Sequence, residues 1–337
     1  MSTPAQPAGS IAAAAVPRPP FSGSIALLGA SSAIARDLVL SLAATGTARL
    51  QLYVRDLAAS ERWLSQHGLQ GRCALYRYEQ YGSQPHDAVI NFVGAGAPQR
   101  VAEMGAAIFE VTRQHDDMVL AGLRHHPERR YIFLSSGAVY GHSFQQPAGP
   151  ATLATFPVNA LGAADFYAIA KLVAECGHRA LPQLDITDLR VFNYFGRNQD
   201  VSGRFFICDI LRAVRDGATL RTTADAMRRD YLHPQDFYQM IECVLAAPPG
   251  NRVLDCYTQA PVDKLELLQA MQARFGLSYE VAGVPAGAQA AVNATGAKPH
   301  YYSLRRDAAA LGYAPAWSSL TGVLAEAEAL LNRVVPA

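Results

Sequence analysis

From residue 21 onward, short apolar runs alternate with longer segments in which apolar residues recur every three to four positions. The short runs have the length and the β-branched content of strands that are buried on both faces. We expect six strands, at Ile25–Leu28, Leu50–Val54, Cys73–Tyr78, Ala88–Val93, Tyr131–Leu134 and Ile186–Phe192. The longer segments have the helical period. We expect helices at Ile34–Ala44, Ala102–Arg113, Asp116–His125, Phe166–Ala180, Phe205–Asp216, Gln235–Ala246, Lys264–Phe275 and Leu320–Val334.

This alternation predicts an α/β fold, a Rossmann-type doubly wound parallel sheet with helices on both faces. Beyond about residue 198 the pattern loosens, which indicates a smaller C-terminal lobe that binds substrate. We therefore divide the chain into a disordered Ala/Pro-rich tail (1–22), a Rossmann domain (23–197) and a region that is mainly the substrate-binding lobe (198–337). We expect part of this last region to cross back to the Rossmann domain.

The composition is that of a compact globular protein with no large charged surface. In 337 residues there are 29 basic and 28 acidic side chains, and 50% of the residues are hydrophobic. This balance predicts neither nucleic acid nor membrane as a partner. The tail lacks the basic start of a signal peptide, and no long apolar run follows, so we expect a cytoplasmic protein. The five cysteines form no C-x-x-C pair, and we interpret them as reduced core thiols.

A turn of small residues follows the first expected strand and leads into a helix. Small side chains let the backbone approach a pyrophosphate, and the helix N-terminus offers free N–H groups and a positive dipole end. Only Gly29 matches a glycine of the pattern G-x-x-G-x-x-G, so an ordinary strand–turn–helix corner remains an alternative. The candidate cofactor-binding residues of this turn are Gly29, Ser31, Ser32, Ala33 and Ile34.

The end of the second expected strand bears on the choice of cofactor. Rossmann-type folds hold an acidic side chain there for the ribose of NAD, or a basic one for the phosphate of NADP. Arg55 takes this position and favours NADP over NAD, but Asp56 is the next residue, and a shift by one position would reverse the inference. A solvated Arg–Asp pair is the structural alternative.

The pattern Tyr167-x-x-x-Lys171 places a phenol and an ammonium group on one face of an expected helix. Only three of the 29 basic residues are lysines, so a lysine at this position indicates a chemical requirement. A tyrosine active near pH 7 needs its pKa lowered by about 3 units, or about 4 kcal/mol. An ammonium group at about 4 Å supplies roughly that much at an effective dielectric constant of about 20. An exposed structural pair is the alternative.

Two other strand ends carry candidate residues. Ser136 follows the strand Tyr131–Leu134, so its hydroxyl is expected in the ligand crevice with Tyr167. Asn91 and Gly94 end the preceding strand, where a glycine leaves room for a cofactor ribose.

Five motifs between about Ser24 and Leu331 resemble a known family. They are Phe133-Leu134-Ser135-Ser136-Gly137-Ala138-Val139-Tyr140-Gly141, Tyr167-x-x-x-Lys171, Arg190-Val191-Phe192-Asn193-Tyr194-Phe195-Gly196, Arg229-Asp230-Tyr231-Leu232-His233-Pro234-Gln235-Asp236 and Leu311-Gly312-Tyr313-Ala314-Pro315. In this order they resemble the extended short-chain dehydrogenases/reductases, in particular the NAD(P)-dependent nucleotide-sugar epimerase/dehydratase family.

The resemblance implies roles for particular residues. Tyr167 would be the acid/base, Lys171 would bind the ribose and lower the pKa of the phenol, and Ser136 would orient the reacting oxygen. Asn193 and Arg229 would face a nucleotide sugar, Arg229 at its diphosphate, and Arg204 would assist. From spacing alone, a local ion pair of Arg229 with an aspartate, Asp225 or Asp230, fits equally well.

Two departures from the family pattern limit these expectations. The family's 4,6-dehydratases carry an Asp-Glu pair where this chain has Gly137-Ala138, so dehydration is not expected. After the third strand the family commonly places an Asp that contacts adenine, and here Glu79 is a candidate substitute.

We therefore expect an NAD(P)-dependent oxidoreductase that acts on a nucleotide-linked sugar, by reduction of a 4-keto-6-deoxy sugar. An NAD-dependent 4-epimerase is the alternative, and a non-catalytic NADP-binding regulatory protein is an alternative of another class. The family also implies a homodimer formed through a four-helix bundle. We expect no metal site, and interpret His125-His126 and Asp116-Asp117 as solvated residues.

Overall fold

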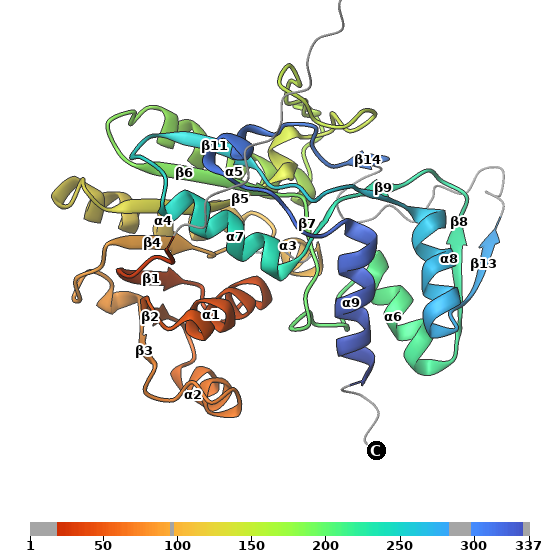
Figure 1. Cartoon of the computed structure of the whole chain (residues 1–337). Coiled ribbons are helices and arrows are strands. Elements are labelled where there is room, and N and C mark those ends of the chain that lie inside the picture. Colours follow the sequence, from red (N-terminus) through yellow and green to blue (C-terminus); the bar gives the residue numbers. More distant parts are fainter. Residues whose placement is uncertain (1–18, 95–97, 283–297, 333–337) are drawn as a thin grey trace, which may run out of the picture.

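Seven parallel strands form the central sheet of the computed structural model, which describes residues 19–94, 98–282 and 298–332. Figure 1 shows this sheet with the smaller lobe beside it. In spatial order the strands are β11 (Arg252–Asp255), β6 (Ile186–Val191), β5 (Arg130–Ser136), β4 (Ala88–Asn91), β1 (Ser24–Leu28), β2 (Arg49–Tyr53) and β3 (Cys73–Tyr76). The predicted Rossmann-type sheet is confirmed. Because β1 lies between β2 and β4, the strand order reverses there, and ligands of such sheets bind at the carboxyl ends beside this reversal.

Helices cover both faces of the sheet, as the continuous apolar strands require. Ile25 and Leu27 of β1 pack in one core cluster with α1, α2 and α7, whereas Ala26 and Leu28 pack in another with α4 and α5. These helices are α1 (Ala33–Thr45), α2 (Leu57–Gln66), α7 (Pro234–Leu245), α4 (Ala107–His125) and α5 (Ala163–Arg179). The short α3 (Pro98–Met104) contacts α5.

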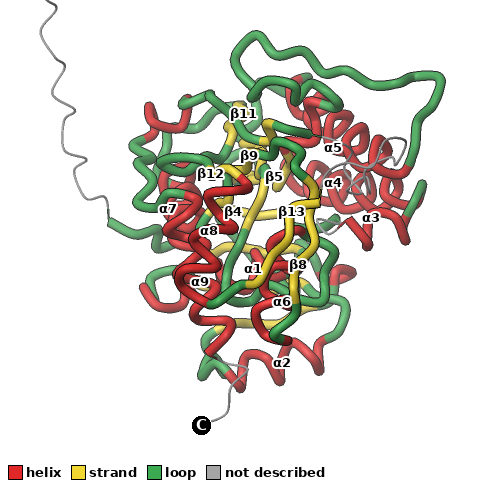
Figure 2. The backbone as a smooth tube through the Cα atoms, turned by 90° about the vertical axis from the view of Figure 1, so that its right-hand side faces the viewer, coloured by secondary structure: helices red, strands yellow, loops and turns green. Residues whose placement is uncertain are grey.

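The smaller lobe has an apolar core of its own. Side chains of α6 (Phe206–Asp216), α8 (Lys264–Phe275) and α9 (Ser319–Asn332) share this cluster, beside the strand pair β8 (Thr219–Thr223) and β13 (Ser278–Ala282). Figure 2 shows these elements together. Both α7 and β11 pack on the large sheet although they come late in the chain, so the chain crosses back to it.

Five short strands and three 3-10 turns connect these elements. The strands are β7 (Asn193–Tyr194), β9 (Arg228–Arg229), β10 (Tyr231–Leu232), β12 (Val262–Asp263) and β14 (His300–Tyr301), and the turns are Tyr78–Gln80, Gly137–Tyr140 and Asp307–Leu311. β9 pairs with both β12 and β14, and this brings residues 228–229 beside residues 300–301. This pairing places side by side two segments that no sequence motif had connected.

The structure corrects several expected elements. The helices expected at Ala102–Arg113 and Asp116–His125 divide instead at Gly105, whose φ of +49° ends α3, and α4 then runs unbroken for 19 residues. The third strand ends at Tyr76, because a 3-10 turn begins at Tyr78. The helix α2 and the strand β11 were not expected. Most of the predicted tail, and the last residues of the helix expected at Leu320–Val334, lie outside the described residues.

Two predictions about polar side chains were wrong. Asp116 is buried against the sheet, and only its neighbour Asp117 is solvated as expected. All five cysteines are free, but Cys176 on α5 is exposed and is not a core thiol. None of the helices within the described residues is both long and apolar enough to span a membrane.

Candidate active site

The turn between β1 and α1 has the geometry of an anion-binding turn. Gly29 has a φ of +75°, and a Cβ there would lie 3.0 Å from the carbonyl carbon of Phe92 and 3.1 Å from the nitrogen of Val93, so only glycine fits. Ser32 is the N-cap residue of α1, and its hydroxyl is buried without a hydrogen-bond partner among the described residues. No acidic side chain occupies the first turn of α1. The turn therefore fits a pyrophosphate group.

The candidate residues of this turn lie together. Ser31 and Ser32 precede α1, and Ala33 and Ile34 are its first two residues. The sequence missed Tyr78, whose hydroxyl lies close enough to the backbone of Gly29 for that backbone to lower its pKa. The ring of Tyr78 meets the ring of His115 edge-on at 4.7 Å between centroids.

The expected substitute for an adenine contact lies elsewhere. Glu79 is exposed, whereas its neighbour Tyr78 is the side chain that reaches the turn. Burial raises the pKa of Tyr78, so its hydroxyl is neutral near pH 7. The residues after β3 thus offer an aromatic ring and a hydroxyl beside the turn, in place of a carboxylate.

The two candidate charged side chains at the end of β2, Arg55 and Asp56, lie in different surroundings. Asp56 caps α2, where its carboxylate accepts a hydrogen bond from the Ala59 nitrogen at 2.9 Å. Arg55 is exposed and follows the strand by two residues. Because Asp56 has a structural task, Arg55 is the charged side chain left at this strand end.

Lys171 reaches from α5 to the carboxyl end of β5. Its Nζ donates to the Leu134 carbonyl oxygen at 2.8 Å and lies 4.3 Å from the centroid of the Phe133 ring. A Cβ at Gly94 would lie 3.4 Å from this Nζ, so the glycine leaves the ammonium group open on that side. Burial lowers the pKa of Lys171 to about 8.

Asn91 supports the loop that carries Gly94. It is buried at the end of β4, where its Oδ1 accepts from the Val93 nitrogen at 2.9 Å and its Nδ2 donates to the Tyr131 hydroxyl at 3.0 Å. Both ends of the amide are engaged by the protein. The structure therefore gives Asn91 a supporting contact behind the crevice, whereas Gly94 lies at its edge.

Three hydroxyl groups meet at the end of β5. The Ser136 hydroxyl lies close enough to Tyr167 to lower the pKa of its phenol, and its Oγ lies 3.3 Å from the hydroxyl of Tyr301. The same Oγ accepts from the Ala138 nitrogen at 3.1 Å, which fixes the serine side chain. Tyr301 was not expected from the sequence, because it lies 165 positions after Ser136 and no motif marked it.

The electrostatics of Tyr167 differ from the expectation. Burial raises its pKa, and only the nearby Ser136 hydroxyl lowers it. The Lys171 ammonium lies on the Leu134 carbonyl oxygen, so the protein groups alone do not produce the lowered phenol pKa that the i, i+4 spacing suggested. Tyr167 is therefore a neutral phenol near pH 7.

Two buried cations lie on the other side of Tyr301. The guanidinium carbon of Arg229 is 5.9 Å from its ring centroid, and the Nζ of Lys298 is 5.0 Å away. Each residue is 9% exposed. Arg229 donates to backbone carbonyl oxygens, including that of Lys298 at 2.6 Å, and forms no ion pair within the described residues. The local pair with Asp225 or Asp230 that spacing allowed is absent from this described region.

Lys298 was visible in the sequence only as one of three lysines. Its pKa is lowered to about 8, by burial and by the nearby charge of Arg229. Among the other candidates, Asn193 donates to the Asp230 carbonyl oxygen at 3.2 Å, and Arg204 is exposed before α6.

Gly137 explains in physical terms why an acidic pair is absent after Ser136. A Cβ at Gly137 would lie 2.4 Å from the ring of Phe192, so no side chain fits there. Ala138 is buried and its nitrogen is bound by Ser136. With Phe192 in this place, the two positions after Ser136 have no room for larger side chains.

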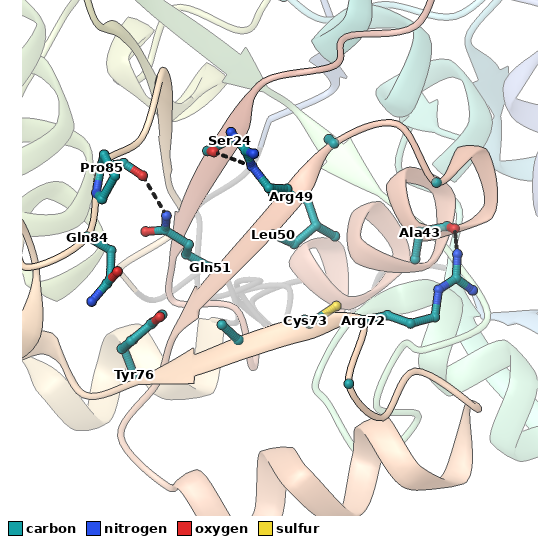
Figure 3. A pocket seen from close by; sticks show the side chains of 14 residues that line it. Ser24, Ala43, Arg49, Leu50, Gln51, Arg72, Cys73, Tyr76, Gln84 and Pro85 are labelled. Atoms are coloured by element: carbon teal, nitrogen blue, oxygen red, sulfur yellow. Dashed lines mark hydrogen bonds between the residues drawn. The ribbon is translucent and has the colours of Figure 1, made fainter.

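Two cavities lie away from these residues. One of about 710 Å³ lies between the amino ends of β1 and β2 and the edge strand β3, with Arg49, Gln51 and Arg72 among its lining (Figure 3). It is separated by the length of a strand from the turn at Gly29. A second, of about 360 Å³, lies in the smaller lobe between Thr223–Met227 and the start of α8. The candidate active site is therefore the group of side chains at the carboxyl ends of the strands.

The parallel sheet, the turn at Gly29 and the helix that carries Tyr167-x-x-x-Lys171 together define a Rossmann-type oxidoreductase. The Tyr-x-x-x-Lys helix lies beside its crevice. The model of the NAD dependent epimerase/dehydratase family matches residues 25–255, and the chain belongs to this family. No curated protein sequence matches the chain.

Solved structures of similar fold are nucleotide-sugar enzymes. UDP-glucose 4-epimerase from Thermotoga maritima, solved with UDP-glucose, is 16% identical with a TM-score of 0.73, over 93% of this chain and 100% of that one. UDP-glucuronic acid 4-epimerase from Bacillus cereus, solved with UDP-glucuronic acid and NAD, is 16% identical with a TM-score of 0.72, over 93% of this chain and 100% of that one. dTDP-glucose 4,6-dehydratase from Bacillus anthracis, solved with NAD, is 14% identical with a TM-score of 0.72, over 91% of this chain and 96% of that one. These identities establish the shared fold.

Proposed function

We propose that the protein transfers a hydride between a nicotinamide dinucleotide and a carbon of a nucleotide-linked sugar, and that its leading reaction is reduction of a 4-keto-6-deoxy sugar. The meeting of Ser136 and Tyr167 at the carboxyl end of β5, beside Lys171, is the observation that carries this proposal. The match of residues 25–255 to the model of the NAD dependent epimerase/dehydratase family supports a reaction of this kind.

The cofactor-binding residues would be those of the turn at Gly29, with Lys171 at the ribose beside Gly94. The bound cofactor supplies the hydride. Ser136 holds the substrate oxygen through its hydroxyl, and Tyr167 gives the proton that this oxygen needs as the carbonyl carbon accepts the hydride. The ketone gains one hydride and one proton and becomes an alcohol.

The protonation state of Tyr167 favours reduction as the leading reaction. Burial keeps the phenol neutral, and a neutral phenol is the form that donates a proton to a carbonyl oxygen. A 4-epimerase must first remove a proton from a hydroxyl group, which needs the phenolate. The epimerase remains the second candidate because the similar structures solved with NAD include UDP-sugar 4-epimerases.

The cations beside Tyr301 support a substrate that carries negative charge. Arg229 and Lys298 are buried and have no carboxylate in an ion pair within the described chain. A diphosphate brings the missing charge and suits a guanidinium group. The cavity of about 360 Å³ in the smaller lobe begins at Met227, next to β9, and is a candidate place for the nucleotide.

A single assay distinguishes the candidates. The purified protein is incubated with NADPH and nucleotide-linked 4-keto-6-deoxy sugars, and NADPH and product are both counted. A reductase consumes one NADPH for each product. An epimerase carries bound NAD through purification and converts its substrate without added reductant. A protein that binds the cofactor and turns over neither class of substrate is the regulatory alternative.

For the cofactor we propose NADP with NAD as the second candidate. The exposed Arg55, beside the engaged Asp56, favours the 2′-phosphate of NADP. The NAD found with the neighbouring structures favours the other choice. Comparison of the two dissociation constants on the purified protein decides between them.

We also propose that the protein forms a homodimer through α4 and α5. Each helix exposes a large apolar side chain, Phe109 (37% exposed) on α4 and Val173 (62%) on α5. Sedimentation of the wild type and of Val173→Glu tests this. A monomeric wild type contradicts it.

A further inference from the structure

The face of α5 that packs on the sheet carries a row of polar and charged side chains. Tyr167, Lys171, Glu175 and His178 follow one another at spacings of four, four and three residues, which places them on one face. Lys171, Glu175 and His178 are 3%, 4% and 0% exposed. Buried charges are costly unless they are paired, so this face needs a reason beyond the packing of a helix on a sheet.

His178 is held between two carboxylates from different elements. Its Nδ1 donates to Asp188 Oδ1 on β6 at 2.6 Å, and its Nε2 donates to Asp116 Oδ1 on α4 at 2.9 Å. Both carboxylates raise the pKa of His178, to about 9, although burial opposes this. The ring is therefore an imidazolium near pH 7, and it ties α5 to the helix on one side and to the strand on the other.

The Asp116 end of this network leads to the loop that faces Lys171. The hydroxyl of Tyr131 donates to Asp116 Oδ1 at 2.7 Å, and Asn91 donates to the same hydroxyl at 3.0 Å. Asn91 in turn accepts from the Val93 nitrogen, one residue before Gly94. One chain of hydrogen bonds thus joins α4, β5 and β4 behind the ammonium group.

The Asp188 end leads outward. Asp188 Oδ2 accepts from Arg179 at 2.7 Å, near the end of α5. Glu175, the third carboxylate of the network, accepts hydrogen bonds from two nitrogens of Arg190. Each carboxylate of the network therefore has a cationic partner of its own besides Lys171.

Lys171 makes no direct contact with these carboxylates in the described structure, yet they act on its charge. Burial lowers its pKa, and Asp116, Asp188 and Glu175, in that order, oppose the effect of burial. The charged groups that face Lys171 are Glu175 and His178 on α5, Asp116 on α4, and Asp188 and Arg190 on β6.

We propose that Asp116 and Asp188, bridged by His178, are positioning residues for Lys171: their hydrogen bonds hold the face of α5 that carries Lys171 against α4 and β6, and hold the loop that places Gly94 at the open side of its ammonium group. This inference rests on the proposed function where it assigns Lys171 to the cofactor. It goes further in naming the groups, one helical turn and more below the crevice, that keep the ammonium group in its working state.

The test measures the titration of Lys171 in the whole chain. Lysine Nζ atoms are labelled isotopically, which gives only three side-chain signals, and the Lys171 signal is assigned by its loss in Lys171→Arg. The variant Asp116→Asn keeps the shape of the side chain and removes its charge. We expect it to lower the pKa of Lys171 by about one unit. Asp188→Asn, which removes the second carboxylate from the other side, is expected to act in the same direction.

A matched control is available just before the start of β6. Asp185 is also buried and also paired, with Arg130 at 2.7 Å, but it does not act on Lys171. Asp185→Asn is expected to leave the Lys171 titration unchanged even where it lowers stability. Equal shifts in Asp116→Asn and Asp185→Asn, or no shift in either carboxylate variant of the network, would overturn the proposal.

Activity supplies a second measurement. The alkaline limit of kcat/KM is expected to move down with the Lys171 titration in Asp116→Asn, whereas a merely structural role would lower activity equally at every pH. Without turnover in the wild type, the proposed function fails, and the titration of Lys171 still decides the present inference. Asp188→Asn decides it if Asp116→Asn does not fold.

Discussion

Two buried lysines, Lys171 and Lys298, flank the same group of hydroxyls and lie in opposite surroundings. Burial lowers the pKa of each to about 8. Lys171 faces three carboxylates that oppose this effect. Lys298 faces the guanidinium of Arg229, which adds to it, and only Asp165 acts in the other direction. One ammonium group has its counter-charge built into the fold, and the other does not.

The difference indicates which part of the site the protein completes by itself. Around Lys171 the charges are balanced by α4, α5 and β6, elements of the sheet domain that hold their positions through regular hydrogen bonding. Around Lys298 the protein supplies rings, those of Phe144 and Tyr301, and a second cation. In the proposed function, an anionic group of the substrate would complete this second half.

Tyr167→Phe tests whether both halves serve one reacting group. The change removes the phenol hydroxyl and keeps the ring, so we expect kcat to fall by about 1,000-fold or more. Tyr167 is also a candidate cofactor-binding residue, but we expect the turn at Gly29 and Lys171 to provide most of the cofactor affinity, so this affinity, measured by fluorescence titration, should stay within about threefold. Equal losses of turnover and cofactor affinity would show that Tyr167 is structural.

Lys298→Met sharpens the contrast between the lysines. Removal of a cation that pairs with a substrate anion is expected to weaken substrate binding by about 10- to 100-fold and leave cofactor binding unchanged. Isothermal titration with a nucleoside diphosphate and with the cofactor measures both. Arg274→Met is the control, since Arg274 is an exposed cation of the smaller lobe that pairs with Glu328. Loss of cofactor affinity alone would reverse our assignment of the two halves.

Arg55→Asp tests the cofactor half. A carboxylate at this strand end repels a 2′-phosphate and accepts hydrogen bonds from ribose hydroxyls, so the preference is expected to move from NADP toward NAD by about tenfold or more. Arg62→Asp, on the neighbouring helix α2, is the control for a change in net charge. An unchanged preference means that another residue of β2 meets the ribose.

The pH dependence of stability follows from the same two lysines. Their pKa in the folded chain is about 8, below the ordinary 10.5, so between these values the unfolded chain binds more protons. These two lysines therefore raise the free energy of unfolding as the pH rises from 8 to 10, whereas buried thiols and phenols with a raised pKa act in the opposite direction. Below pH 8 the lysines are protonated in both states and the cost of their burial is fully present. Denaturant titrations of the wild type and of Lys298→Met isolate the lysine contribution: the free energy of unfolding of the wild type should rise relative to that of the variant by about 1 kcal/mol or more over this range. A difference between the two proteins that does not grow from pH 8 to pH 10 contradicts the assignment.

The sequence predicted the sheet and pointed to half of the candidate site because those features are local. Apolar runs identify β1 to β6, and a glycine turn, a strand-end serine and a Tyr-x-x-x-Lys helix are each read from a few adjacent residues. It did not predict the place of Tyr301 and Lys298, which reach the site only because β14 pairs with β9. It also placed Asp116 in solvent, because a polar residue at helical spacing reveals nothing about a buried partner such as His178.

The most direct measurement of the central claim follows the three lysine Nζ signals while ligands are added one at a time. NAD or NADP should shift the signal of Lys171 and leave that of Lys298 nearly unchanged. A nucleoside diphosphate should shift Lys298 and leave Lys171 nearly unchanged. If the cofactor moves neither lysine, or moves Lys298 alone, the assignment of the crevice beside Gly94 to a nicotinamide dinucleotide is wrong.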